Sequence, residues 1–172
     1  MGLDMYIYKF KKPIDLSSQS AISLFKDLNN VEQINDRKLK DFIIDYVYVD
    51  EEEEMHLCQR VAYWRKANMV HKFLYDSRED KTLSDYMSIP ISINTLGELL
   101  GICKEIVYRY SQNNTKGILY AKEKLPTQKG FFFGSIEYDD GYFSDIEITI
   151  SQIESLLQNM QLDEELFYLA DY

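Results

Sequence analysis

Five residues around the single tryptophan follow one another at steps of three and four: Val61, Trp64, Asn68, His71 and Tyr75. This spacing predicts one face of an α-helix. A ring, an amide and an imidazole on one face could stack on a nucleobase, bond to its edge and transfer a proton. The alternative is that Trp64 and His71 are ordinary core side chains, and the sequence leaves both interpretations open.

A second group of candidate residues lies later in the chain. Residues 130–135 hold three consecutive phenylalanines between two glycines, and glycine permits close approach of the backbone to another group. We expect this segment to form the opposite wall of a pocket on the Trp64 face; burial of the phenylalanines in the core is the alternative. The predicted ligand-binding residues are therefore Trp64, Arg65, Asn68, His71, Phe133 and Ser135, with His71 as the candidate catalytic residue.

The charge of the chain points to a different kind of surface. Its 172 residues include 29 acidic and 19 basic side chains, which gives a net charge of −10. This excess of negative charge disfavours direct binding to nucleic acid and favours a basic protein partner. The predicted partner-binding residues are Glu51, Glu52, Glu53, Glu54, Asp139, Asp140 and Asp145. A solvated face or a helix start is the alternative explanation for such a run.

Standard catalytic and metal-binding motifs are missing from the sequence. It contains no glycine-rich phosphate loop, no HExxH and no CxxC, and it has only two histidines and two cysteines. We therefore expect no metal and no cofactor, and a non-enzymatic function is favoured over an enzymatic one. No stretch reaches the ~18 apolar residues of a membrane span, and the start of the chain does not resemble a secretory signal. These features predict a cytoplasmic protein that does not bind membranes.

The elements that must position these residues are predicted from hydrophobic periodicity. Alternation predicts strands over residues 3–8 and 42–49, a short buried strand over 130–134 and an edge strand over 166–169. Helical spacing predicts helices over 20–34, from the acidic run to about residue 75, and over 95–110, 117–124 and 146–160. Thr95 is the expected cap of the third helix, which should bury Leu100 and Ile106. Residues 76–90 are predicted to be a loop and 139–141 a turn.

Together these elements predict an α+β fold, in which several helices pack on a small antiparallel sheet. The length and the lack of a linker predict a single globular domain over residues 1–172.

Three blocks of the sequence carry a family resemblance. They are Met1-Gly2-Leu3-Asp4-Met5-Tyr6, then Tyr63-Trp64-Arg65-Lys66-Ala67-Asn68 with His71, and Leu125-Pro126-Thr127-Gln128 followed by Gly130-Phe131-Phe132-Phe133-Gly134-Ser135. In combination they resemble an uncharacterised family encoded by phages and prophages. The resemblance implies a phage accessory protein in the cytosol of a bacterial host.

Small phage accessory proteins often antagonise host defence. The leading expectation is thus an inhibitor of a host defence protein or ribonucleoprotein, such as a CRISPR nuclease, which would make the chain an anti-CRISPR protein that binds through an acidic surface. One alternative is a metal-independent nuclease or hydrolase that uses His71. The other is a module that sequesters a nucleotide signal with Trp64 and Asn68.

Overall fold

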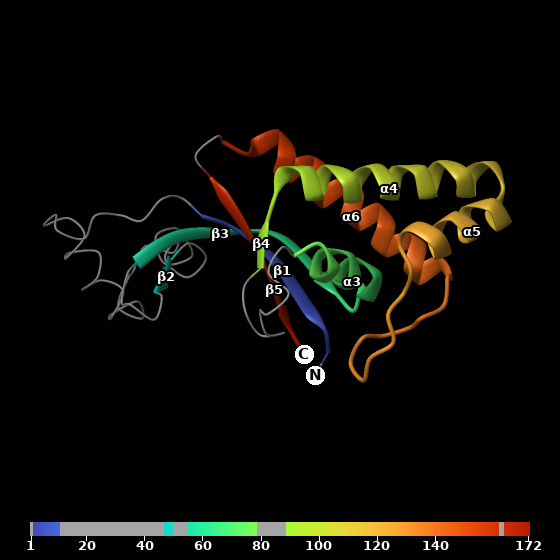
Figure 1. Cartoon of the computed structure of the whole chain (residues 1–172), viewed down its shortest axis with the longest axis horizontal. Helices are drawn as coiled ribbons and strands as arrows, with labels where there is room; N and C mark the ends of the chain where they lie inside the picture. Colours follow the sequence, from blue (N-terminus) through green and yellow to red (C-terminus); the bar gives the residue numbers. More distant parts are fainter. Residues whose placement is uncertain (1, 11–46, 50–54, 79–88, 162–163) are drawn as a thin grey trace, which may run out of the picture.

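The computed structural model describes residues 2–10, 47–49, 55–78, 89–161 and 164–172 (Figure 1). Within these ranges the strands are β1 (Asp4–Phe10), β2 (Val47–Val49), β3 (Met55–Arg65), β4 (Ile89–Ile91) and β5 (Glu165–Asp171). The helices are α3 (Asn68–Asp76), α4 (Ile93–Gln112), α5 (Asn114–Lys124) and α6 (Asp140–Asn159). In these described ranges no helix is long and apolar enough to cross a membrane.

The strands form one sheet in the order β2-β3-β1-β5-β4, and every neighbouring pair is antiparallel. Strand β1 is central, with Met5 opposite Trp64 of β3 on one side and Ala170 of β5 on the other. Leu3, Met5 and Ile7 are fully buried, while the residues between them are half-buried. This alternation gives the sheet one face toward the helices and one face away from them. The α+β prediction of helices on an antiparallel sheet is confirmed.

Strand β3 is bent and its outer edge is closed by a helix. The pairing with β1 shifts between Ile7 and Tyr8, which leaves Val61 as a β-bulge. Beyond the short β2, the edge of β3 faces α6. There the Gln152 side chain accepts a hydrogen bond from the Tyr63 N–H at 2.6 Å and donates one to the Tyr63 carbonyl at 2.9 Å. The amide group thus replaces a strand partner and protects the edge from pairing with another chain.

Helices α4, α5 and α6 form a layer beside the sheet, with α4 and α6 side by side (Figure 1). Ser92 caps α4 by accepting a hydrogen bond from the Thr95 N–H at 3.0 Å. Helix α4 buries Leu96, Leu99, Cys103 and Ile106. At the return to α5, a Cβ on Gly117 would lie 2.5 Å from the Cα of Tyr110. Only glycine therefore permits this close crossing of the two helices.

Several predicted elements differ from the structure. Residues 55–65 are strand β3 rather than the first half of a helix, and residues 130–134 form a turn rather than a strand. Ser92 caps α4 in place of Thr95, and Leu100 is only half-buried. Residues 140 and 141 open α6, and β5 lies inside the sheet because β4 is the strand beyond it. The predicted helix over 20–34, most of the strand over 42–49 and residues 79–88 lie outside the described residues.

Candidate functional site

The turn from β3 to α3 separates Trp64 from the other residues of the predicted helical face. Lys66 ends the strand with φ of 63°, a left-handed conformation that is unfavourable for a residue with a side chain. It is held there because the Lys66 N–H donates to the Leu3 carbonyl at 2.7 Å and the Lys66 carbonyl accepts from the Asn68 N–H at 2.8 Å. Trp64 therefore lies on a strand, and the prediction of one helical face through Trp64, Asn68 and His71 is wrong.

Asn68 joins α3 to the segment between α5 and α6. Its Nδ2 donates to the carbonyl oxygens of Phe133 at 2.9 Å and Ser135 at 2.7 Å. Its Oδ1 accepts from the backbone N–H of Gln128 at 2.9 Å. The side chain is 2% exposed, so its hydrogen-bonding groups are directed at protein backbone rather than at a ligand. Sequence reasoning paired Asn68 with this segment, and the structure brings the two together as a packed contact.

His71 is enclosed by aromatic rings. Its Nδ1 lies 2.7 Å from the Tyr168 hydroxyl, and its ring centroid lies 5.1 Å from Phe133, 5.6 Å from Tyr75 and 5.7 Å from Tyr172. Burial raises the pKa of Tyr168 well above its ordinary value, so this hydroxyl keeps its proton. With His71 3% exposed, a substrate cannot reach the imidazole without rearrangement of the core.

The remaining predicted ligand-binding residues point in different directions. Trp64 is buried toward α6, where its indole N–H donates to the Thr149 hydroxyl at 2.9 Å. Arg65 is exposed, and its Nε lies 3.9 Å from the Asp4 carboxylate. Phe133 is buried, whereas Ser135 is exposed. Asn68, His71, Phe133 and Ser135 therefore gather around one junction, while Trp64 and Arg65 belong to opposite faces of the sheet.

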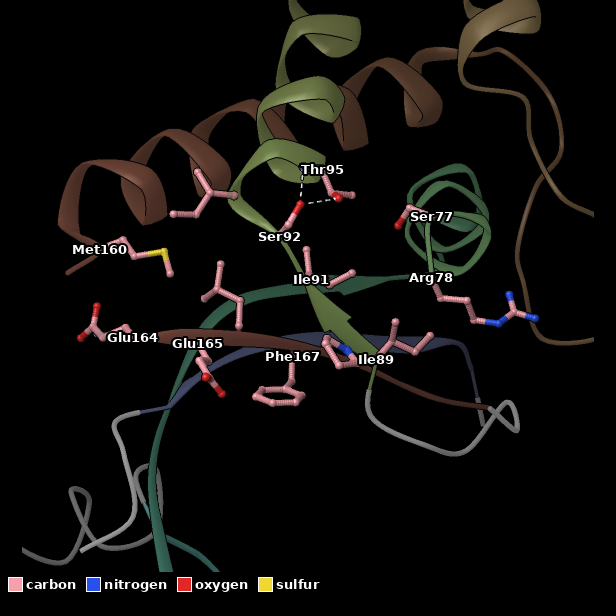
Figure 2. A pocket seen from close by; sticks show the side chains of 13 residues that line it. Ser77, Arg78, Ile89, Ile91, Ser92, Thr95, Met160, Glu164, Glu165 and Phe167 are labelled. Atoms are coloured by element: carbon pink, nitrogen blue, oxygen red, sulfur yellow. Dashed lines mark hydrogen bonds between the residues drawn. The ribbon is translucent and has the colours of Figure 1, made fainter. Parts of the chain in front are cut away.

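Neither of two cavities found among the described residues is lined by a predicted ligand-binding residue. The larger, about 670 Å³, lies between β4, β5, the start of α4 and the end of α3 (Figure 2). Its walls are mostly apolar, and Figure 2 shows the Arg78 guanidinium turned away from Ile91 and Phe167. The smaller, about 400 Å³, lies between α3, α4 and the end of α5.

The start of α6 gathers acidic side chains, and we name Glu137, Asp139, Asp140 and Asp145 the acidic turn. Asp139 caps the helix by accepting from the Tyr142 N–H at 3.2 Å, and Asp140 follows in the first turn, where the helix dipole favours negative charge. Throughout the described ranges, no lysine or arginine comes within 4 Å of these four carboxylates.

The charge of the acidic turn is not compensated locally. Partial burial, together with the negative charge of Asp139, raises the pKa of Asp145 from 3.8 to about 6. A nearby cation would have lowered this pKa instead. The partner-binding prediction at Asp139, Asp140 and Asp145 thus falls on an unpaired group of acids, whereas residues 51–54 lie outside the described residues.

Sequence reasoning missed two exposed residues in the segment that precedes α6. Glu137 adds a fourth acid, and Phe131, 95% exposed, stands in the segment that leads into α6. That segment descends toward the chain termini in Figure 1 and is anchored where the Leu3 N–H donates to the Phe132 carbonyl at 3.1 Å. This backbone hydrogen bond fixes the segment, and the Phe131 side chain remains exposed to solvent. The only sequence signal was three phenylalanines in succession, since adjacent residues cannot all face the core.

The described ranges contain side chains of the types that bind metal ions, and a buried cysteine. These ranges contain no group of three or more histidine, cysteine, aspartate and glutamate side chains that could hold a metal ion. Cys103 is buried, and burial raises the pKa of its thiol to about 12, so it remains a protonated core side chain. No family model, curated protein or solved structure matches this chain.

Proposed function

We propose that the protein is a non-enzymatic inhibitor of the phage accessory type, which binds a basic host defence protein or ribonucleoprotein through the acidic turn. A CRISPR nuclease is the partner class that this chemistry fits, and the bacterial cytosol is the compartment where the two would meet. The observation that carries the proposal is a group of four carboxylates with no cation within 4 Å among the described residues, in which Asp145 has a pKa of about 6.

A group of acids without a nearby cation gains more binding free energy from a cationic partner than a group that is already paired. In the free protein the negative charge of Asp139 repels that of Asp145, and this repulsion is relieved when lysine or arginine side chains of a partner approach. Proteins that handle nucleic acid present such side chains in their binding channels. A net charge of −10 adds long-range attraction during the encounter.

The segment that precedes α6 carries an exposed aromatic side chain that a partner could contact. Binding energy is typically concentrated in a few aromatic anchors surrounded by polar side chains. Phe131 is 95% exposed on a segment whose backbone is fixed by the three hydrogen bonds of Asn68. A fixed segment loses little conformational freedom on binding, which favours affinity.

The residues that were predicted to bind a ligand or to act in catalysis make contacts within the protein that explain their presence. Asn68, His71 and Trp64 are each 2–3% exposed, and each hydrogen-bonds to a group of the protein. Their burial supports a function at the surface rather than hydrolysis by His71 or nucleotide binding by Trp64 and Asn68.

Charge reversal tests the role of the acidic turn. The double variant Glu137→Lys/Asp140→Lys spares the helix cap at Asp139 and should slow association with the basic partner. The double variant Glu98→Lys/Glu123→Lys makes the same change in net charge on α4 and α5 and should have a smaller effect. Surface-immobilised partner and a salt series measure both. Equal association rates for the two variants would show that net charge, not the acidic turn, governs binding.

A further inference from the structure

The face of the sheet opposite the helices carries aromatic and cationic side chains. Because Leu3 and Met5 face the helices, Asp4 and Tyr6 between them face away. Across the ladder, Asp4 is opposite Arg65 and Tyr6 is opposite Tyr63. We name Asp4, Tyr6, Arg60, Tyr63 and Arg65 the tyrosine face.

The two rings of this face lie next to each other. The centroids of Tyr6 and Tyr63 are 5.3 Å apart. Tyr8 lies 5.9 Å from Tyr6 and is not counted among the rings available for stacking, because it makes other contacts. Tyr63 is 40% exposed, so part of its ring is open to solvent. Rings at this separation on neighbouring strands are arranged as a platform on which successive nucleobases can stack.

Two arginines lie close to the rings, with the Arg60 guanidinium over those of Tyr6 and Tyr63. The Arg60 guanidinium lies 6.0 Å from the Tyr6 centroid and 5.9 Å from the Tyr63 centroid, and no carboxylate among the described residues comes within 4 Å of it. The Arg65 side chain is 59% exposed, with only a long 3.9 Å contact to Asp4. Both cations are therefore placed to meet an anion beside the rings.

This face also carries acids: Asp4 on β1 and, on β5, Asp171 opposite Asp4 and Glu165 opposite Phe10. Asp4 accepts a hydrogen bond from the Tyr63 hydroxyl at 2.6 Å, and this bond raises the pKa of Tyr63. The contact fixes the Tyr63 ring over the sheet and leaves Asp4 shared between a hydroxyl and Arg65. The two arginines lie on β3, whereas Asp171 and Glu165 lie on β5 and the acidic turn lies at the start of α6, so the cations and most of these acids are on different elements.

We propose that the tyrosine face binds single-stranded nucleic acid, with Tyr6 and Tyr63 stacking on bases and Arg60 and Arg65 contacting phosphates. Stacking is tolerant of sequence, so binding should depend weakly on base identity. The proposal departs from the expectation drawn from net charge, which disfavoured nucleic acid, and it does not depend on the acidic turn or on the proposed function.

Fluorescence anisotropy of a short labelled oligouridylate with the full chain tests this proposal. Two phosphate contacts predict that the logarithm of the association constant falls with the logarithm of salt at a slope of about −1.4, and Arg60→Ala should bring this slope to about −0.7. Tyr63→Leu should weaken binding about fivefold or more, because the leucine has no ring to stack. Tyr63→Phe keeps the ring and should bind within about twofold of the wild type.

Matched controls come from the helical layer. Tyr108 is 61% exposed on α4, and Arg109 lies 4.4 Å from the Tyr120 centroid but is paired with Glu105 at 2.6 Å. Tyr108→Ala and Arg109→Ala should leave binding unchanged, and circular dichroism establishes that every variant is folded. Three results would overturn the proposal: no binding by the wild type at low salt, equal binding by Tyr63→Leu, or tighter binding of polyglutamate than of the oligonucleotide.

Discussion

The indole N–H of Trp64 donates a hydrogen bond to the Thr149 hydroxyl, 2.9 Å away, in the interior between β3 and α6. The same hydroxyl donates to the Asp145 carbonyl at 2.6 Å. Thr149 is fully buried, so water cannot replace either partner. The tryptophan that seemed suited to ligand stacking thus connects the sheet to the helix that carries the acidic turn.

Replacing Thr149 should show that this bond is structural. Thr149→Val keeps the volume but leaves the Trp64 N–H buried without a partner, so the free energy of unfolding should fall by about 1–3 kcal/mol. Thr149→Ser keeps the hydroxyl and should lose less. Urea denaturation followed by tryptophan fluorescence measures both, and equal stability of the valine variant and the wild type would contradict this role.

Asn68 offers a second test at the junction. In Asn68→Asp, an oxygen replaces the Nδ2 group that donates to the Phe133 and Ser135 carbonyls, so attraction becomes repulsion. We expect a loss of about 1–3 kcal/mol and faster proteolysis between residues 128 and 135. Asn113→Asp is the control, because Asn113 acts only as a helix cap toward the Lys116 N–H and aspartate caps equally well. Proteolysis equally fast in both variants would contradict the anchoring role.

The sequence predicted the elements whose periodicity is undisturbed. In and just before β1 the apolar residues Leu3, Met5 and Ile7 alternate with half-buried ones, as expected of a strand with one face in the core. In α4 the apolar stripe located the buried face, with Ile106 at its centre. Leu100 was predicted to be buried, but a stripe of three- and four-residue steps is wider than the surface of α4 that α5 and α6 cover.

The prediction from the sequence failed where the spacing typical of a helix runs across the end of a strand. Trp64, Asn68 and His71 fit a helical spacing by coincidence across a turn, and the left-handed Lys66 that makes the turn is not a glycine. Residues 130–134 have the composition of a strand, yet the Phe133 carbonyl bonds to the Asn68 side chain instead of a neighbouring strand. The sequence suggested that this segment lies near Asn68, but local pattern does not show that its carbonyls bond to a side chain instead of to a strand.

The crossing of α4 and α5 gives a pair of predictions with opposite signs. Gly117→Ala should destabilise the protein by about 1–3 kcal/mol, because its Cβ would collide with the Tyr110 backbone. Gly101→Ala lies on the exposed face of α4 with nothing within 4 Å of its Cβ, and should stabilise by about 0.5–1 kcal/mol. Thermal unfolding measures both, and shifts of the same sign would show that the helix crossing is placed wrongly.

Asp145 should make stability depend on pH. Folding raises its pKa from 3.8 to about 6, so the folded protein holds this proton more tightly than the unfolded chain. Deprotonation therefore destabilises the fold, with no effect below about pH 4 and the full effect above about pH 6. Asp145→Asn should stabilise the protein at pH 7 and change little at pH 4, as measured by urea denaturation.

Asp140→Asn is the control for this prediction, because Asp140 is an exposed acid in the same helix. It removes a charge that the helix dipole favours, and should therefore lower stability at pH 7 by about 0.3–1 kcal/mol. If Asp145→Asn gave the same stability change at pH 4 and pH 7, Asp145 would not be an uncompensated carboxylate.

A titration of defence activity tests the central claim most directly. A panel of purified CRISPR nucleases, each loaded with guide RNA, is assayed for DNA cleavage at increasing ratios of this protein. If the protein inhibits by binding, cleavage by its target should fall linearly with the amount of protein added and reach its minimum at a fixed stoichiometry. It should not change with incubation time once binding is complete. Glu137→Lys/Asp140→Lys should abolish this inhibition, while Glu98→Lys/Glu123→Lys retains it. Inactivation at substoichiometric ratios that grows with time, or cleavage unaffected across the panel, would contradict the account.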